Sequence, residues 1–160
     1  MFCKFVPSTL ETNHKFKETM IKKLLSTNSY VTGFDFSLLL LRITFGGLML
    51  VNHGIGKMNT LLAGGEIKFP DPFGIGSEAS LGLAVFSDVV CAAVLVFGLL
   101  TRLALIPLLI TMLVAAFVVH INDGLKDMEM ALLYLSPYLI IFINGAGKYS
   151  VDKIAFDKKG

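Results

Sequence analysis

Two ionisable residues stand inside strongly apolar stretches of this sequence. Arg42 occurs in FSLLLLRITFGG, and Asp88 occurs in SLGLAVFSDVVC. A charged residue within a membrane-spanning helix costs roughly 2.5 to 3.5 kcal/mol, so each of the two requires a partner, a water-filled cavity or a function. If both stretches are antiparallel helices, helical rise puts the two Cα atoms at depths that differ by about 10 Å, a gap that a long Arg side chain partly closes.

Two interpretations of these residues remain open at the level of sequence. The first is a buried ion pair between Arg42 and Asp88 that fixes helix packing, with Arg42 otherwise extending to the inner membrane interface. The second is a functional Asp88 that handles protons or orients a ligand. The residue types alone do not separate the two.

A second group of polar residues falls at the predicted ends of the apolar segments. His53, Lys57, His120 and Glu129 all lie near one face of the membrane if the segments alternate in direction. Such residues can ligate a metal or haem, or they can hydrogen-bond the carbonyl groups of a quinone beside an apolar cavity. Quinone contact demands the least strict geometry of the three, and ordinary interfacial residues are the further alternative.

The elements that hold these residues must be membrane-spanning helices. The chain of 160 residues is 54% hydrophobic and 16% charged, with a mean hydropathy of +0.73. That composition is too apolar for an ordinary soluble domain of this length. The formal net charge of +2 does not suggest a nucleic-acid partner.

Hydropathy predicts an all-α bundle of four spanning helices, since about 20 apolar residues cross the hydrocarbon core. We place the helices near residues 36–53, 80–100, 103–121 and 130–144. Only Thr101-Arg102 separates the second from the third, so these two must be antiparallel neighbours unless they form one very long helix. The loop between the first and second contains FPDPFGIG, which either folds back as a cap over the bundle or stays an exposed loop.

The distribution of Lys and Arg predicts that both termini are cytoplasmic. Ten basic residues fall on the inner side in that orientation, and three fall on the outer side (inner Lys4, Lys15, Lys17, Lys22, Lys23, Arg102, Lys148, Lys153, Lys158 and Lys159; outer Lys57, Lys68 and Lys126). The predicted organisation is a tail over residues 1–35, a membrane domain over 36–152 and a short tail over 153–160. The first tail is either an amphipathic interfacial helix or a solvated segment, with Met20 as a possible true start.

The cysteines, Cys3 and Cys91, show neither the spacing of a metal site nor that of a redox pair. We expect no disulfide and treat Cys91 as a small packing residue. The first apolar segment is long and is not followed by a small-residue cleavage site, so it is interpreted as a permanent anchor and not as a signal peptide.

Several short motifs together resemble the DoxX family. In order they are HGIGK, FPDPFGIGS, GLLTRLALIPLL, VVHINDG, EMALLYL and GAGKYSVD, and they span about residues 36–152. The FPDPFGIG loop is similar to bacterial members of the Bacteroidota-like branch. Family members commonly carry a glutamate where this chain has Asp88, a change that keeps the charge and shortens the side chain by one methylene.

The resemblance implies a multi-pass protein of the bacterial inner membrane that works as a quinone-linked subunit or accessory of an oxidoreductase complex. Quinone is then the expected cofactor, oxidoreductase subunits and the lipid bilayer are the expected partners, and a homo-oligomer is a further possibility. The expected site residues are Arg42, His53, Lys57, Asp88, His120 and Glu129, with no metal. The alternative function is non-enzymatic: an assembly factor, a chaperone or a small-solute transporter.

Overall fold

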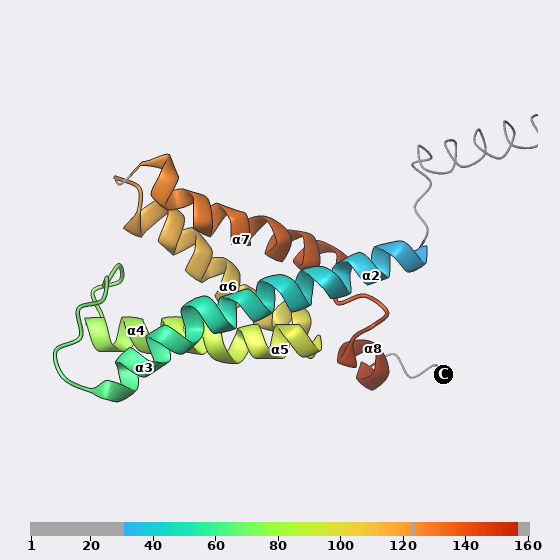
Figure 1. Cartoon of the computed structure of the whole chain (residues 1–160), viewed down its shortest axis with the longest axis horizontal. Coiled ribbons are helices and arrows are strands. Elements are labelled where there is room, and N and C mark those ends of the chain that lie inside the picture. Colours follow the sequence, from blue (N-terminus) through green and yellow to red (C-terminus); the bar gives the residue numbers. More distant parts are fainter. Residues whose placement is uncertain (1–30, 123, 157–160) are drawn as a thin grey trace, which may run out of the picture. The chain divides into compact units, whose positions relative to one another are not determined.

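The computed structural model of the chain describes residues 31–122 and 124–156. These residues form four long helical rods and one short C-terminal helix (Figure 1). The first rod runs through α2 (Val31–Leu41), η1 (Arg42–Gly46), η2 (Met49–Gly54) and α3 (Ile55–Ala63), and the second through α4 (Ser77–Val85), η3 (Phe86–Cys91) and α5 (Ala92–Phe97). The third contains α6 (Thr101–Val114) and η4 (Ala115–Val119), the fourth is α7 (Leu125–Asn144), and α8 (Val151–Phe156) follows. The predicted N-terminal interfacial helix lies outside the described residues.

The rods have the length and composition of membrane-spanning helices. Gly33–Ala63, Ser77–Phe97 and Thr101–Val119 are each long and apolar enough to cross a bilayer, and Met128–Asn144 is a shorter apolar helix. Large apolar side chains also cover the outside of the bundle, as Phe36, Leu103 and Ile143 illustrate with 58%, 62% and 70% exposure. A surface of this kind suits contact with lipid and not with water. The predicted all-α membrane fold is confirmed.

The helices extend beyond the predicted bounds at the end where the first two rods are joined. The first rod continues to Ala63 instead of ending at His53, and the second begins at Ser77 instead of Ser80. The fourth begins at Leu125, five residues before the predicted start. Hydropathy marks only the part of a helix inside hydrocarbon, so helical turns in the polar interface escape it.

The second and third rods form a tight antiparallel hairpin, which excludes one continuous helix. The break is not Thr101-Arg102, as predicted, but Gly98 to Leu100. Gly98 adopts a left-handed backbone with φ of 68°, and its N–H donates to the Leu95 carbonyl while Leu99 N–H donates to the Val94 carbonyl. This pair of bonds is a Schellman motif, which satisfies the last carbonyls of a helix and turns the chain away from it.

Four segments of the rods have π-helical hydrogen bonding. They are η1, η2, η3 and η4, and the rods run through them without a break. Such i→i+5 segments are rare and are found frequently at functional sites. Arg42 opens η1, His53 lies in η2, Asp88 lies in η3, and His120 directly follows η4.

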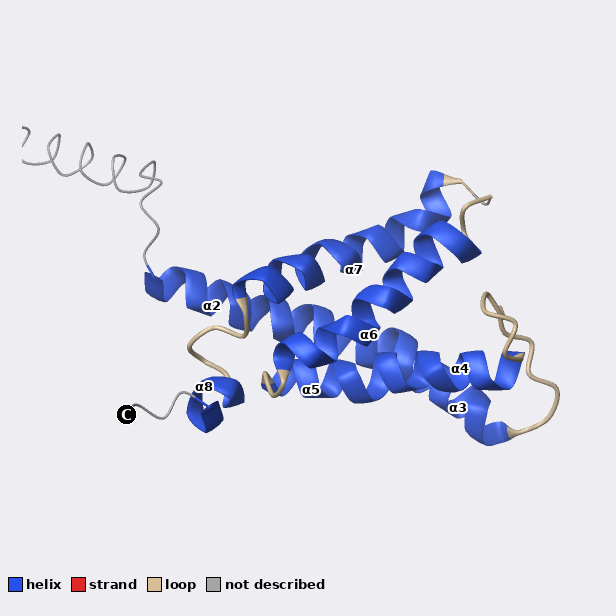
Figure 2. Ribbon diagram, turned by 180° about the vertical axis from the view of Figure 1, so that it is seen from behind, coloured by secondary structure: helices blue, strands red, loops and turns tan. Residues whose placement is uncertain are grey.

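The two ends of the bundle differ. We call the end that carries residues 64–76 the loop end, and the end that carries Gly98 to Leu100 the turn end. The rods pack closely toward the turn end, whereas α6 and α7 diverge from α3 and α4 toward the loop end in both views (Figures 1 and 2). The buried core runs along the bundle axis and includes Leu38, Met49, Leu95, Leu105, Leu108, Tyr138 and Ile141.

Candidate functional site

An ion pair lies inside the bundle between the first and second rods. Lys57 Nζ is 2.5 Å from Asp88 Oδ2, and the Asp88 side chain is fully buried while that of Lys57 is 27% exposed. Asp88 Oδ1 and the neighbouring Ser87 Oγ are also buried, and neither has a hydrogen-bond partner among the described residues. The pair therefore holds a buried carboxylate with one oxygen still able to accept a hydrogen bond.

Helical spacing brings Lys57 to Asp88. Because the first rod continues through HGIGK, His53 and Lys57 are four residues apart and share one side of it. Gly54 lets the two rods touch at this level, since a Cβ there would lie 2.6 Å from the Asp88 carbonyl oxygen. A larger residue at this position would push the rods apart and separate Lys57 from its partner.

Aromatic side chains hold the His53 ring from the side of α7. The rings of His53 and Tyr134 meet edge to face, with centroids 5.5 Å apart and an interplanar angle of 89°. Phe45 packs on Tyr134 in the same manner at 5.7 Å, and the Tyr138 hydroxyl donates to the Phe45 carbonyl at 3.3 Å. Edge-to-face contacts fix the plane of a ring. The His53 imidazole is thus oriented by the fourth rod.

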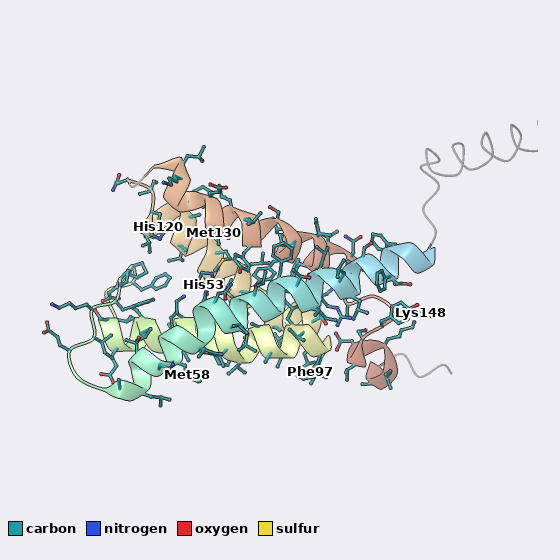
Figure 3. The ribbon with its side chains drawn as sticks, viewed as in Figure 1. His53, Met58, Phe97, His120, Met130 and Lys148 are labelled. Atoms are coloured by element: carbon teal, nitrogen blue, oxygen red, sulfur yellow. The ribbon has the colours of Figure 1, made fainter. Side chains whose placement is uncertain are left out.

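A cavity of about 540 Å³ begins at these residues and extends toward the loop end. All four rods contribute to its walls, and most of the lining is apolar. The polar side chains at the wall are few and include His53, Lys57, His120 and Tyr134. Figure 3 shows His53 on the side of the first rod that faces α7, with His120 and Met130 at the loop end of α6 and α7. A mostly apolar cavity with a few polar groups is typical of a small-molecule site.

The loop of residues 69–73, here called the cap, covers part of this cavity. Phe69, Pro70, Pro72 and Phe73 all line it, and the Phe69 ring lies 5.9 Å from Lys57 Nζ. Of the two alternatives that the sequence left open for FPDPFGIG, the structure supports the cap.

Asp71 fastens the cap to the start of α4. Its carboxylate accepts hydrogen bonds from Gly76 N–H at 2.8 Å, Ile75 N–H at 3.1 Å and the Ser80 hydroxyl at 2.8 Å. The bond from Gly76, followed by that from Ser80, lowers the pKa of Asp71 below its ordinary value, because donors stabilise the ionised form. The cap therefore depends on a carboxylate that stays charged.

Arg42 lies at the turn end, apart from the cavity. It is fully buried, and its Nη2 donates to the Tyr149 carbonyl at 2.5 Å. Asp152, which follows closely in the chain, accepts from Leu100 N–H at 2.6 Å and Thr101 N–H at 2.9 Å. These contacts join GLLTR to GAGKYSVD, so the two motifs form one structural unit around the Arg42 side chain. A smaller cavity of about 260 Å³ borders this unit.

The predicted site residues do not all lie together: four are at or beside the cavity, one is at the turn end and one is exposed. It brings His53, Lys57 and Asp88 together and puts His120 at the wall of the same cavity. Arg42 lies at the turn end, and Glu129 is exposed and does not line the cavity. Of the two interpretations that the sequence left open, the Arg42–Asp88 ion pair is wrong: the partner of Asp88 is Lys57, and Arg42 binds a backbone carbonyl.

Tyr134 and Tyr138 were missed by reasoning from the sequence. A signal was present, because residues four apart share a helix side, and tyrosine hydroxyls in an apolar helix need partners. Asp152 was missed as well, since nothing in the sequence pairs it with a helix start 51 residues earlier.

The arrangement can hold an electron-rich oxygen and move a proton. Lys57 and Tyr134 line the cavity and can donate hydrogen bonds into it, and the His53 imidazole at the same wall can give or take a proton. Within residues 31–122 and 124–156, no group of three or more His, Cys, Asp or Glu residues is arranged to hold a metal ion.

Comparison with known proteins places the chain in a family. The family model described as DoxX matches residues 37–121, more than half of the chain. A Haemophilus influenzae protein described as uncharacterized is 32% identical over 129 residues, which cover 76% of this chain and 85% of that protein. No solved structure matches the chain. The chain therefore belongs to the DoxX family.

Proposed function

We propose that this protein is a quinone-linked subunit of a membrane oxidoreductase complex and that the loop-end cavity holds the quinone head group. The observation that supports this most is the Lys57–Asp88 pair beside His53 at the polar end of an otherwise apolar cavity. A quinone pairs carbonyl oxygens with an apolar ring and tail, so it needs a few donors in apolar surroundings.

The donor set fits that head group. Lys57 Nζ, the oriented His53 ring and Tyr134 line the cavity and can donate hydrogen bonds to carbonyl oxygens. Asp88 is fully buried and does not line the cavity, so its part is to hold Lys57 in place. The cavity of about 540 Å³ falls within the range of small-molecule sites, roughly 300 to 1,000 Å³. The volume of the cavity and its donors therefore suit the carbonyl form of the head group.

A bound quinone supplies two-electron, two-proton redox chemistry. The residues of this chain bind and orient the head group and hold a proton at His53, which lines the cavity. In this proposal a partner subunit exchanges the electrons, and the exposed apolar faces of the rods contact lipid and that subunit.

We further propose that both termini are cytoplasmic and that the loop end faces outward from the inner membrane. The excess of Lys and Arg on the turn-end side supports this orientation. The head group would then lie in the outer half of the bilayer.

The chain contains no tryptophan, so a single introduced Trp can report on the cavity. Phe73→Trp, the cap reporter, puts the indole in the cap at the cavity wall. Phe97→Trp, the turn reporter, puts it at an exposed position at the turn end, away from the cavity. In nanodiscs, menaquinone should quench the cap reporter saturably and the turn reporter only in proportion to the quinone concentration in the lipid.

The same preparation allows a second readout. Lipid extraction of the detergent-purified full chain should yield bound quinone, and Asp88→Asn should lower the amount. Equal, unsaturated quenching at both reporters and an extract without quinone would contradict the proposal. Partner subunits recovered without quinone would favour the alternative, a non-enzymatic assembly role.

A further inference from the structure

One side of the loop-end cavity is bounded by residues that also face the outside of the bundle. Leu83, Phe86 and Ile110 line the cavity, yet they are 56%, 50% and 50% exposed. A residue that lines a cavity and is half exposed lies at its rim. We call these three residues the rim; it lies between the α4–η3 part of the second rod and α6.

The divergence of the rods explains why the cavity is open there. The turn at Gly98 joins the second and third rods tightly, but α4 and α6 separate toward the loop end (Figure 2). Pro107 and Thr111 form the α6 wall behind the rim. The rim side chains are all apolar, as expected for an opening that faces hydrocarbon.

The cavity has a second exposed edge toward the loop end, where Phe73 of the cap and Met130 of α7 line it with 59% and 51% exposure. The edge-to-face contact of His53 with Tyr134 joins the first rod to α7 on the opposite side. Toward the loop end, the cap places Phe69 over Lys57 and adds Pro70, Pro72 and Phe73 to the wall. A ligand that enters at the rim thus meets apolar side chains before it reaches Lys57 and His53.

We infer that the cavity is loaded sideways from the bilayer through the rim, and that its ligand is an amphiphile whose apolar tail remains in the lipid while its head group reaches Lys57 and His53. This inference rests on the proposed function and specifies the substrate class of the site: a long-tailed, membrane-partitioned quinone. Basic groups at the polar end complement the electron-rich oxygens of such a head group.

The experiment measures how fast menaquinone reaches the cavity in nanodiscs. All proteins are full-length and carry the cap reporter, Phe73→Trp. Ile110→Phe narrows the rim, Ile110→Ala widens it, and Ile106→Phe is the matched control, because Ile106 is 44% exposed on the same helix and does not line the cavity. Phe69→Ala opens the cap instead.

We expect Ile110→Phe to slow the quenching of the cap reporter about tenfold, since a bulkier side chain raises the barrier to passage. Its midpoint at equilibrium should stay unchanged, because entry and exit use the same opening. Ile110→Ala should match or exceed the original rate, and Ile106→Phe and Phe69→Ala should change it less than about twofold.

The opposite pattern would overturn the inference. Faster quenching in Phe69→Ala with no effect of Ile110→Phe would show entry through the cap from water, and the proposed quinone site would stand. A shift of the midpoint in Ile110→Phe that equals the change in rate would put Ile110 at the head group and not at the rim. No saturable quenching in any of the proteins would end both the inference and the proposed function.

Discussion

At the scale of single residues, the Lys57–Asp88 pair explains how an acidic side chain is tolerated in the middle of the bundle. Asp88 is fully buried and Lys57 is its cationic partner. Removing one member of a buried ion pair destabilises a protein more than replacing both members by apolar residues, because the charge that is left keeps its desolvation cost.

Lys57→Met should therefore destabilise the protein by about 3 kcal/mol, and adding Asp88→Asn should restore much of that loss. Thermal unfolding in detergent measures both. Lys68→Met is the control, since Lys68 is exposed, and it should change stability by less than about 0.5 kcal/mol. Equal effects of Lys57→Met and Lys68→Met would show that the pair does not stabilise the fold.

Gly98 is a second residue whose identity is set by its surroundings. Its φ of 68° is unfavourable for other residues, and a Cβ would overlap Arg42 Nη1. Gly98→Ala should cost roughly 2 kcal/mol or more, of which about 1 to 2 kcal/mol is backbone strain.

Gly82→Ala supplies the matched control for Gly98→Ala. Gly82 lies in α4, and a Cβ there meets nothing within 4 Å, so alanine should be neutral or stabilise the helix. Thermal unfolding of the two variants side by side tests the assignment. A Gly98→Ala protein as stable as Gly82→Ala would mean that the turn does not require glycine.

At the scale of elements, the cap is held by one carboxylate. Because its pKa in the folded protein is lowered by the Gly76 and Ser80 bonds, Asp71 stabilises the cap fully above the ordinary pKa of aspartate. That contribution is lost as the pH falls through the lowered value.

The cap reporter, Phe73→Trp, makes this acid release measurable. A water-soluble quencher should reach the introduced indole more readily at acidic pH than at neutral pH. Asp71→Asn should abolish this pH dependence and show the higher accessibility throughout. Retention of the same acid transition in Asp71→Asn would assign it to another group.

The other end of the bundle is closed by a different kind of element contact. Residues 145–156 return to the start of α6, where Asp152 binds Leu100 and Thr101 N–H. Asp152 N–H in turn donates to the Gly98 carbonyl at 2.9 Å. These reciprocal bonds join the GLLTR motif to the GAGKYSVD motif at the turn end.

At the scale of the whole molecule, the charge distribution predicts the direction of each crossing. Reporter fusions after Lys68 and Lys126 should report an external location, and a fusion after Lys158 should report a cytoplasmic one. An external signal at Lys158 would mean an odd number of crossings. The shorter fourth rod, Met128–Asn144, would then be the segment to re-examine.

The helices were predictable because hydrocarbon leaves the backbone few other structures. The pairing of Asp88 was not, since ending the first helix at His53 left only Arg42 as a partner within the membrane. The continuation of that helix carries Lys57 one further turn along, to the level of Asp88. Polar helical turns at a membrane interface leave no hydropathy signal, so the correct partner was hidden by a helix boundary.

The cavity could be anticipated only in part. Its two histidines and its lysine were found because polar residues at the ends of apolar helices are conspicuous. Its aromatic wall and its rim were not, because Tyr134, Leu83 and Ile110 look like ordinary packing residues in the sequence. Their roles depend on which rods diverge, and no short-range pattern encodes that.

The π-helical segments have a consequence for how the length of this chain can change. Each π-helical turn accommodates one residue more than an α-helical turn would, while the helical stretches on both sides keep their orientation about the helix axis. Losing a residue within Met49–Gly54 or Phe86–Cys91 would restore regular hydrogen bonds without rotating the flanks. Losing one from α6 would turn everything beyond it by about 100°. Single-residue deletions are thus tolerable at these π-helical turns, right beside the residues of the candidate site.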